Sequence, residues 1–212
     1  MDTILQIEGL SKKINGQLLL NNIEMKISTP GIYGIVGRNG SGKSLLFKTI
    51  AGLLVPTEGK IKVFDQYLEK GAFPKSFGAV LDTGGFLPHY SGFQNLKLLS
   101  SIKNLITEKE IREVLDFVGL RSAGNKKVRN YSLGMKQRLS IAQAIMEKPK
   151  LLILDEALNG LDEAGVDFFR KVFLDLKNKG TTILLASHNR EDIELLCDEI
   201  YKMDNGVLKM SS

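Results

Sequence analysis

Residues 37–44 of this 212-residue chain read GRNGSGKS, and this run constrains the fold more than any other segment. It fits the phosphate-loop pattern, in which glycines precede a lysine and a serine. Residues 32–36 before it are apolar, as a buried central strand is, and residues 43–51 after it have the apolar spacing of a helix that stops at Gly52. A strand, a glycine-rich loop and a helix in this order predict an α/β fold that binds a nucleoside triphosphate.

The chemistry of such a loop requires these residue types. Glycines let backbone amides converge on a phosphate, the Lys43 ammonium reaches the β- and γ-phosphates, and the Ser44 hydroxyl is a ligand for Mg²⁺. The loop by itself leaves ATP and GTP open. The predicted nucleotide-binding residues are Gly37, Arg38, Asn39, Gly40, Ser41, Gly42, Lys43, Ser44 and Leu45.

A second apolar strand ends in two carboxylates. Residues 151–154 are apolar, and Asp155 and Glu156 follow them directly. In open α/β folds the ligand lies at the carboxyl ends of the strands, so we expect both acids beside the phosphate loop. Asp155 is expected to hold Mg²⁺, mostly through water, and Glu156 to polarise the water that attacks the γ-phosphate.

Strand and helix patterns indicate one domain with two regions. Strand patterns cover residues 3–8, 18–27, 32–36, 60–64, 78–81, 151–154 and 181–186, and residues 200–203 and 207–210 are typical of a terminal hairpin. Between residues 83 and 145 these patterns vanish, and Thr107 with Glu110 forms a capping box before an apolar helical stripe. We therefore predict a core at 1–82 and 146–212 and a helical subdomain at 83–145.

Composition narrows the classes of function. No run approaches about 18 uncharged apolar residues, so no membrane span is expected, and residues 1–8 do not have a signal-peptide pattern. The single cysteine, Cys197, cannot form an internal disulfide, which fits a reducing cytosol. The net charge of +5 is spread along the chain, so nucleic acid is not an expected partner.

Three further motifs carry a family resemblance. Residues 130–138 read NYSLGMKQR, residues 159–162 read NGLD, and His188 follows the strand pattern at 181–186. With the phosphate loop and the acid pair, they resemble the signature motif, D-loop and switch histidine of ATP-binding cassette (ABC) proteins, in an order that covers nearly the whole chain. The resemblance implies a P-loop ATPase core with a RecA-like mixed sheet and flanking helices, an N-terminal antiparallel β region, and an inserted helical subdomain with the signature motif.

The same resemblance implies how the site is completed. Two cassettes, as a homodimer or a heterodimer, would enclose ATP and Mg²⁺ head to tail. Ser132 and Gly134 of one cassette would contact the γ-phosphate held by the other, His188 would contact the γ-phosphate, and Asp162 belongs to the D-loop. A separate transmembrane permease would place a cytoplasmic helix between core and helical subdomain, which puts this chain on the cytoplasmic, inner face of the cell membrane.

The chain departs from the family pattern in three places. In the signature motif Tyr131, Leu133 and Met135 replace the usual residues, while the phosphate-facing pair is kept. Asp82 stands where the family has the Q-loop glutamine; an acid there still binds Mg²⁺, and together with residues 85–96 it is similar to cassettes that export antimicrobial peptides or drugs. Ile14 replaces the aromatic residue that normally stacks on adenine, so weaker purine binding is expected.

These features distinguish four functional classes. The length of one cassette favours a transporter ATPase over a soluble ATPase of translation, because the latter usually carries two cassettes. A chromosome-maintenance ATPase would contain long coiled-coil heptads, which the sequence lacks. Retention of Lys43, Asp155, Glu156 and His188 disfavours a binding module without hydrolysis. We expect the ATP-hydrolysing subunit of an exporter, with the soluble ATPase of translation as the alternative.

Overall fold

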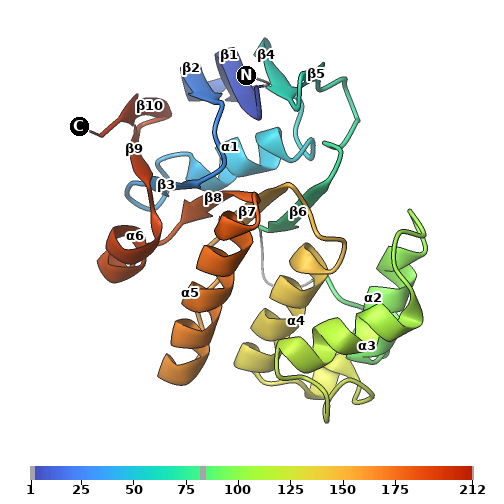
Figure 1. Cartoon of the computed structure of the whole chain (residues 1–212). Coiled ribbons are helices and arrows are strands. Elements are labelled where there is room, and N and C mark those ends of the chain that lie inside the picture. Colours follow the sequence, from blue (N-terminus) through green and yellow to red (C-terminus); the bar gives the residue numbers. More distant parts are fainter. Residues whose placement is uncertain (1–2, 82–84, 212) are drawn as a thin grey trace.

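The computed structural model describes residues 3–81 and 85–211, which form two β-sheets with helices between and below them (Figure 1). The smaller sheet is antiparallel, in the order β2-β1-β4-β5. Its strands are β1 (Leu5–Ile14), β2 (Gln17–Ile27), β4 (Glu58–Val63) and β5 (Gln66–Tyr67). Alternate residues of β2, among them Ile23, Met25 and Ile27, are buried, as the period-two pattern predicted.

The larger sheet has the order β10-β9-β3-β8-β7-β6 and is parallel except for the edge strand β10. Its strands are β3 (Ile32–Val36), β6 (Phe77–Val80), β7 (Leu151–Asp155), β8 (Thr182–Ala186), β9 (Glu199–Asp204) and β10 (Val207–Met210). The three central strands are apolar and almost fully buried, as strands covered on both faces must be. The predicted mixed sheet with an antiparallel region is confirmed.

Helices cover both faces of the larger sheet. Figure 1 shows α1 (Lys43–Ile50) lying between the two sheets, where Leu46, Phe47 and Ile50 join one buried cluster with residues of both. On the opposite face α4 (Leu133–Ile145) and α5 (Glu163–Asn178) pack against the sheet in a second cluster, and α6 (Arg190–Leu196) follows β8. This layering leaves the carboxyl ends of β3 and β7 at one edge, next to the start of α1.

The chain between β6 and β7 is built from helices. They are α2 (Gly92–Ser100), α3 (Glu108–Phe117), a short 3₁₀ helix (Val128–Asn130) and α4. The predicted capping box is confirmed, since the Thr107 hydroxyl accepts a bond from the Glu110 amide and the Glu110 carboxylate accepts one from the Thr107 amide. A second capping box starts α2 at Ser91 with Gln94, which the sequence analysis did not identify although the spacing is the same.

The first strand extends well beyond the predicted residues 3–8. Gly9 has a φ of +57°, and the register with β2 shifts between Ile7 and Leu10. A bulge of this kind inserts a residue and interrupts the alternation of apolar and polar side chains. The sequence pattern therefore ended at the bulge, whereas pairing with β4 continues to Ser11 and pairing with β2 continues to Ile14.

Candidate nucleotide-binding site

The phosphate loop lies between the end of β3 and the start of α1, as predicted. Gly40 and Gly42 have φ angles of +78° and +112°, in the left-handed region that other residues rarely adopt. Gly42 is the N-cap of α1 and offers no side chain to the amides of the first helical turn. Since the N-terminus of a helix carries a partial positive charge and unpaired amides, this end of α1 suits a phosphate.

Two further features show why the loop needs these residues. A Cβ on Gly37 would lie 2.2 Å from the Met203 carbonyl oxygen, so a larger residue cannot occupy the position. The Ser41 hydroxyl is buried and has no hydrogen-bond partner within the described residues. A buried polar atom without a partner costs free energy, so the Ser41 hydroxyl is available to bond a phosphate oxygen. The loop therefore fits a bound phosphate group.

Lys43 folds back over the loop that precedes it. Its side chain is largely buried, and the ammonium donates hydrogen bonds to the carbonyl oxygens of Gly37 (2.8 Å) and Arg38 (3.2 Å). An ammonium has three donors, so one remains for a phosphate oxygen after these two bonds. The fold thus holds a positive charge at the centre of the loop.

The acid pair reaches the same place from β7. A cavity of about 430 Å³ is lined by both segments, namely by Leu19, Asn39, Gly40, Gly42, Lys43, Ser44, Leu45, Asp155 and Glu156. The Ser44 hydroxyl and the Asp155 carboxylate are hard oxygen donors, the ligand type that Mg²⁺ prefers. The residues therefore fit Mg²⁺ together with a triphosphate. Asp82, the third predicted metal ligand, lies outside the described residues.

Glu156 and His188 lie in direct contact. The Nδ1 atom of His188 is 2.7 Å from Oε2 of Glu156, and the His188 amide donates to the same oxygen at 3.3 Å. Asn159 also donates to this oxygen, at 3.3 Å. Glu156 has a φ of +52°, a strained conformation for a glutamate of the kind found at functional sites. Glu156 and His188 were both predicted as site residues, but their contact was not, and Asn159 was placed in the D-loop segment without a role at Glu156.

The signature segment lies at the start of α4. Ser132 is the N-cap, and its hydroxyl oxygen accepts a bond from the Met135 amide, which leaves its proton free to be donated. Gly134 is so close to the loop before α5 that a Cβ would lie 3.1 Å from the Gly160 carbonyl oxygen. Neither Ser132 nor Gly134 is among the residues that line the cavity at the phosphate loop. The structure therefore brings the loop and the acid pair together within one chain, but not the signature pair.

Two polar residues of α4 connect the signature helix to the segment after the acid pair. The buried Gln137 amide donates to the Ala157 carbonyl oxygen at 2.6 Å. Arg138 donates to the carboxylate of Asp162, the N-cap residue of α5, at 3.4 Å. Gln137 and Arg138 stand within the signature segment, but the sequence did not indicate these contacts. Tyr131, a departure from the family pattern, is buried and donates to the Ala123 carbonyl oxygen at 2.7 Å.

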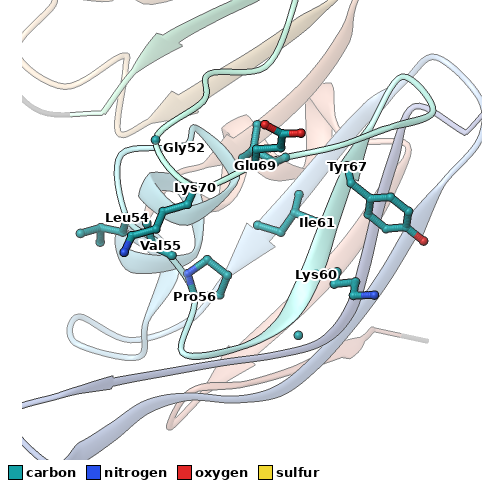
Figure 2. A pocket seen from close by; sticks show the side chains of 12 residues that line it. Gly52, Leu54, Val55, Pro56, Lys60, Ile61, Tyr67, Glu69 and Lys70 are labelled. Carbon is teal, nitrogen blue, oxygen red and sulfur yellow. The ribbon is translucent and has the colours of Figure 1, made fainter.

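A more apolar cavity of about 370 Å³ lies at the other end of α1 (Figure 2). Figure 2 shows Ile61 between the segment of Leu54, Val55 and Pro56 on one side and Tyr67 on the other. The cavity contains none of the predicted site residues. The polar groups that suit a nucleotide are therefore gathered at the phosphate loop and not in this apolar cavity.

The profile of the ABC transporter family matches residues 20–159, well over half of the chain and all of the segment from the phosphate loop to the acid pair. The chain belongs to the ABC transporter family. It is thus an ABC-type, ATP-binding ATPase, and the predicted family is confirmed.

Curated relatives and solved structures agree with this assignment to the ABC family. The chain is 44% identical over 209 residues to the uncharacterized ABC transporter ATP-binding protein YybJ of Bacillus subtilis (strain 168), covering 98% of this chain and 96% of the relative. It is 36% identical over 211 residues to the bacitracin transport ATP-binding protein BcrA of Enterococcus faecalis, covering 98% and 68%. A solved ATP-binding subunit of an ABC transporter superimposes with a TM-score of 0.90 at 26% identity, over 99% of this chain and 90% of that one.

None of the helices formed by residues 3–81 and 85–211 is long and apolar enough to cross a membrane.

Replacing Ile14 by tyrosine is expected to tighten ATP binding by this ABC ATPase. Ile14 stands at the position that the family resemblance assigns to the adenine-stacking residue. It ends β1, whose partner strand β2 contributes Leu19 to the cavity wall, and its side chain is 37% exposed. An aromatic ring there can stack on adenine, which stabilises the complex by about 1 kcal/mol, or about a fivefold lower Kd. Titration with a fluorescent ATP analogue measures the change, and Ile14→Leu is the control. An unchanged Kd for Ile14→Tyr would show that β1 does not contact the base.

Proposed function

We propose that this chain is the ATP-hydrolysing subunit of a membrane exporter and acts through nucleotide-driven dimerisation. The observation that carries the proposal is the incomplete site of the single chain. The phosphate loop, Lys43 and the acid pair line one cavity, whereas Ser132 and Gly134 do not line it. A second cassette in head-to-tail arrangement supplies this pair. The Ser132 hydroxyl and the Gly134 backbone amide then donate hydrogen bonds to the γ-phosphate.

Each residue of the cavity has a proposed task in hydrolysis. Lys43 and the loop amides bind the phosphates, and Ser44 with Asp155 holds Mg²⁺, which supplies positive charge against the phosphate oxygens when bound. Glu156 accepts the proton of the attacking water. Within residues 3–81 and 85–211, His188 and Asn159 bond Oε2 of its carboxylate, which leaves Oε1 for the water. His188 orients Glu156 and contacts the γ-phosphate.

A separate permease is the proposed membrane partner. A cavity of about 240 Å³ lies between the core and α4, with Leu53 and Phe73 on the core side and Ser140 and Gln143 on α4. Leu53 and Phe73 are 54% and 62% exposed, so this cavity presents two large apolar side chains to a partner. Leu81 and Gly85, which flank the undescribed Asp82 segment, also line this cavity. We propose that residues 83–145 form a subdomain and that a cytoplasmic helix of the permease occupies this cleft.

Replacing Phe73 by glutamate tests the docking proposal. The charge would have to be buried against the permease helix, so we expect the variant to lose co-purification with the membrane protein that co-purifies with the wild-type chain. Nucleotide binding should stay unchanged, because Phe73 is not part of the phosphate-loop cavity. Leu195→Glu on α6 is the matched control, since Leu195 is 57% exposed and lies outside the cleft. Normal co-purification of Phe73→Glu would contradict the assignment of the cleft.

Export of antimicrobial peptides is the proposed process. It is supported by the similarity to a protein named for bacitracin transport, and by Asp82 and residues 85–96, which are similar to exporter cassettes. In cells that lack this chain, the wild type should restore resistance to peptide antibiotics and the Phe73→Glu variant should not. If the chain were instead a soluble ATPase in translation, the wild type and the Phe73→Glu variant should give the same resistance, because that function does not need a permease.

A further inference from the structure

The segment that carries His188 is anchored by a buried ion pair between two helices. Asp192, in α6, is 2% exposed. Its Oδ1 atom accepts two bonds from Arg170 of α5, from Nε at 2.9 Å and from Nη2 at 2.6 Å. A buried carboxylate that accepts two donors from one guanidinium is held in a single orientation, because the fork of the arginine is rigid.

The other carboxylate oxygen of Asp192 bonds the segment that contains His188. The Ser187 hydroxyl donates to Oδ2 at 2.9 Å, and the oxygen of the same hydroxyl accepts a bond from the Asn189 amide at 3.1 Å. Ser187 therefore uses both its donor and an acceptor site. The residues immediately before and after His188 are both fixed by this one hydroxyl, and through it by Asp192.

His188 has little other support of its own. Its side chain is 69% exposed, and within the described residues its hydrogen-bond partner is Glu156. The direction of an exposed ring is then set by its backbone and by that one contact. We propose that Arg170 and Asp192 are positioning residues that hold His188 against Glu156, acting through Ser187. This inference rests on the proposed role of His188 in hydrolysis.

The surroundings of Arg170 suit this task and explain why lysine could not replace it. Its guanidinium also bonds Glu191 at 2.7 Å and Asp167 at 3.3 Å, so three acids surround one cation. The hydrogen bond to Glu191, and after it the one to Asp192, raise the pKa of Arg170 above its ordinary value. A lysine keeps the positive charge but has a single ammonium nitrogen, so it cannot replace both the Nε and the Nη2 hydrogen bonds to Oδ1 of Asp192. Arg170→Lys should therefore loosen Asp192 and Ser187 without leaving a buried carboxylate unpaired.

The test uses Arg170→Lys and Ser187→Ala in the full chain, with ATP turnover measured in the presence of Mg²⁺. We expect kcat to fall on the order of tenfold in each variant, as a small misplacement of a catalytic group causes, while KM for ATP changes little. The deciding measurement repeats both substitutions in a His188→Ala background. There neither should lower kcat further, because a residue that acts only through His188 has nothing left to position.

Arg190→Lys is the matched control. Arg190 lies on the same helix as Asp192 and forms an exposed pair with Glu194 at 2.6 Å, so its replacement should leave kcat unchanged. If Arg170→Lys lowers kcat equally with and without His188, its role is structural and the inference is wrong. If His188→Ala is impaired but Arg170→Lys and Ser187→Ala are not, this inference alone fails. Full turnover by His188→Ala would instead remove the role of His188 on which it rests.

Discussion

The Glu156→Gln variant is expected to bind ATP with wild-type affinity, to hydrolyse it about 10²–10⁴ times more slowly, and to accumulate as a dimer with ATP trapped inside. Glutamine has nearly the shape of glutamate and keeps an oxygen that can contact His188, but it cannot take a proton from water at neutral pH. The free energy of ATP binding therefore still closes the dimer, and the step that reopens it is lost.

Two measurements check this expectation together. Single-turnover hydrolysis gives the chemical rate, and size-exclusion chromatography with ATP gives the oligomeric state. Glu113→Gln, on the exposed face of α3 and outside the cavity, is the control and should behave as the wild type in both. A Glu156→Gln variant with normal turnover would mean that another group accepts the proton. A slow variant that stays monomeric with ATP would contradict nucleotide-driven dimerisation.

The Lys43→Ala variant is expected to lose nucleotide binding. The Lys43 ammonium donates hydrogen bonds to the carbonyl oxygens of Gly37 and Arg38. Among the described residues that line the phosphate cavity, Lys43 is the one with a positively charged side chain. Losing a charged hydrogen bond to phosphate costs about 3 kcal/mol, on the order of a hundredfold in Kd. The bonds that shape the loop are lost as well, so the measured effect should be at least this large.

Isothermal titration with ATP and with ADP measures the loss. Thermal unfolding without nucleotide separates it from a general loss of stability, and Lys171→Ala on the exposed face of α5 is the control. Retained ATP affinity in Lys43→Ala would contradict the assignment of the phosphate loop. Both nucleotides should lose affinity, because the ammonium reaches the β-phosphate that both carry, and the loss for ATP should be at least as large because its γ-phosphate is also within reach.

Much of the site was predictable because it is local in the chain. The apolar strand, the glycines and Lys43 follow one another directly, and so do β7 and its acids. In such segments each residue's role depends on its immediate neighbours, and any fold that buries the two strands at one edge brings the loop and the acids together. The limits of the strands in the larger sheet followed from the same local patterns. At β1 these patterns were wrong because Gly9 forms a bulge.

Contacts between segments that are distant in the chain could not be predicted from the sequence. The contact of Glu156 with His188 exists because β7 and β8 are parallel neighbours with Asp155 opposite Ala186, so the residues that follow each strand end meet. A pattern of apolar residues says that a strand is buried but not which strand lies beside it. The bond from Gln137 to Ala157 depends in the same way on how α4 packs against the sheet.

By itself, the sequence determined the family, the phosphate loop, the acid pair and the chemistry each residue type can perform, because these depend on residue identity and spacing. Only the tertiary structure decided that His188 contacts Glu156, that Arg170 and Asp192 hold the segment beside it, and that Gln137 bonds the Ala157 carbonyl oxygen. The physical reason is that hydrogen bonds and cavities depend on distances between segments, and strand order and helix packing alone set those distances.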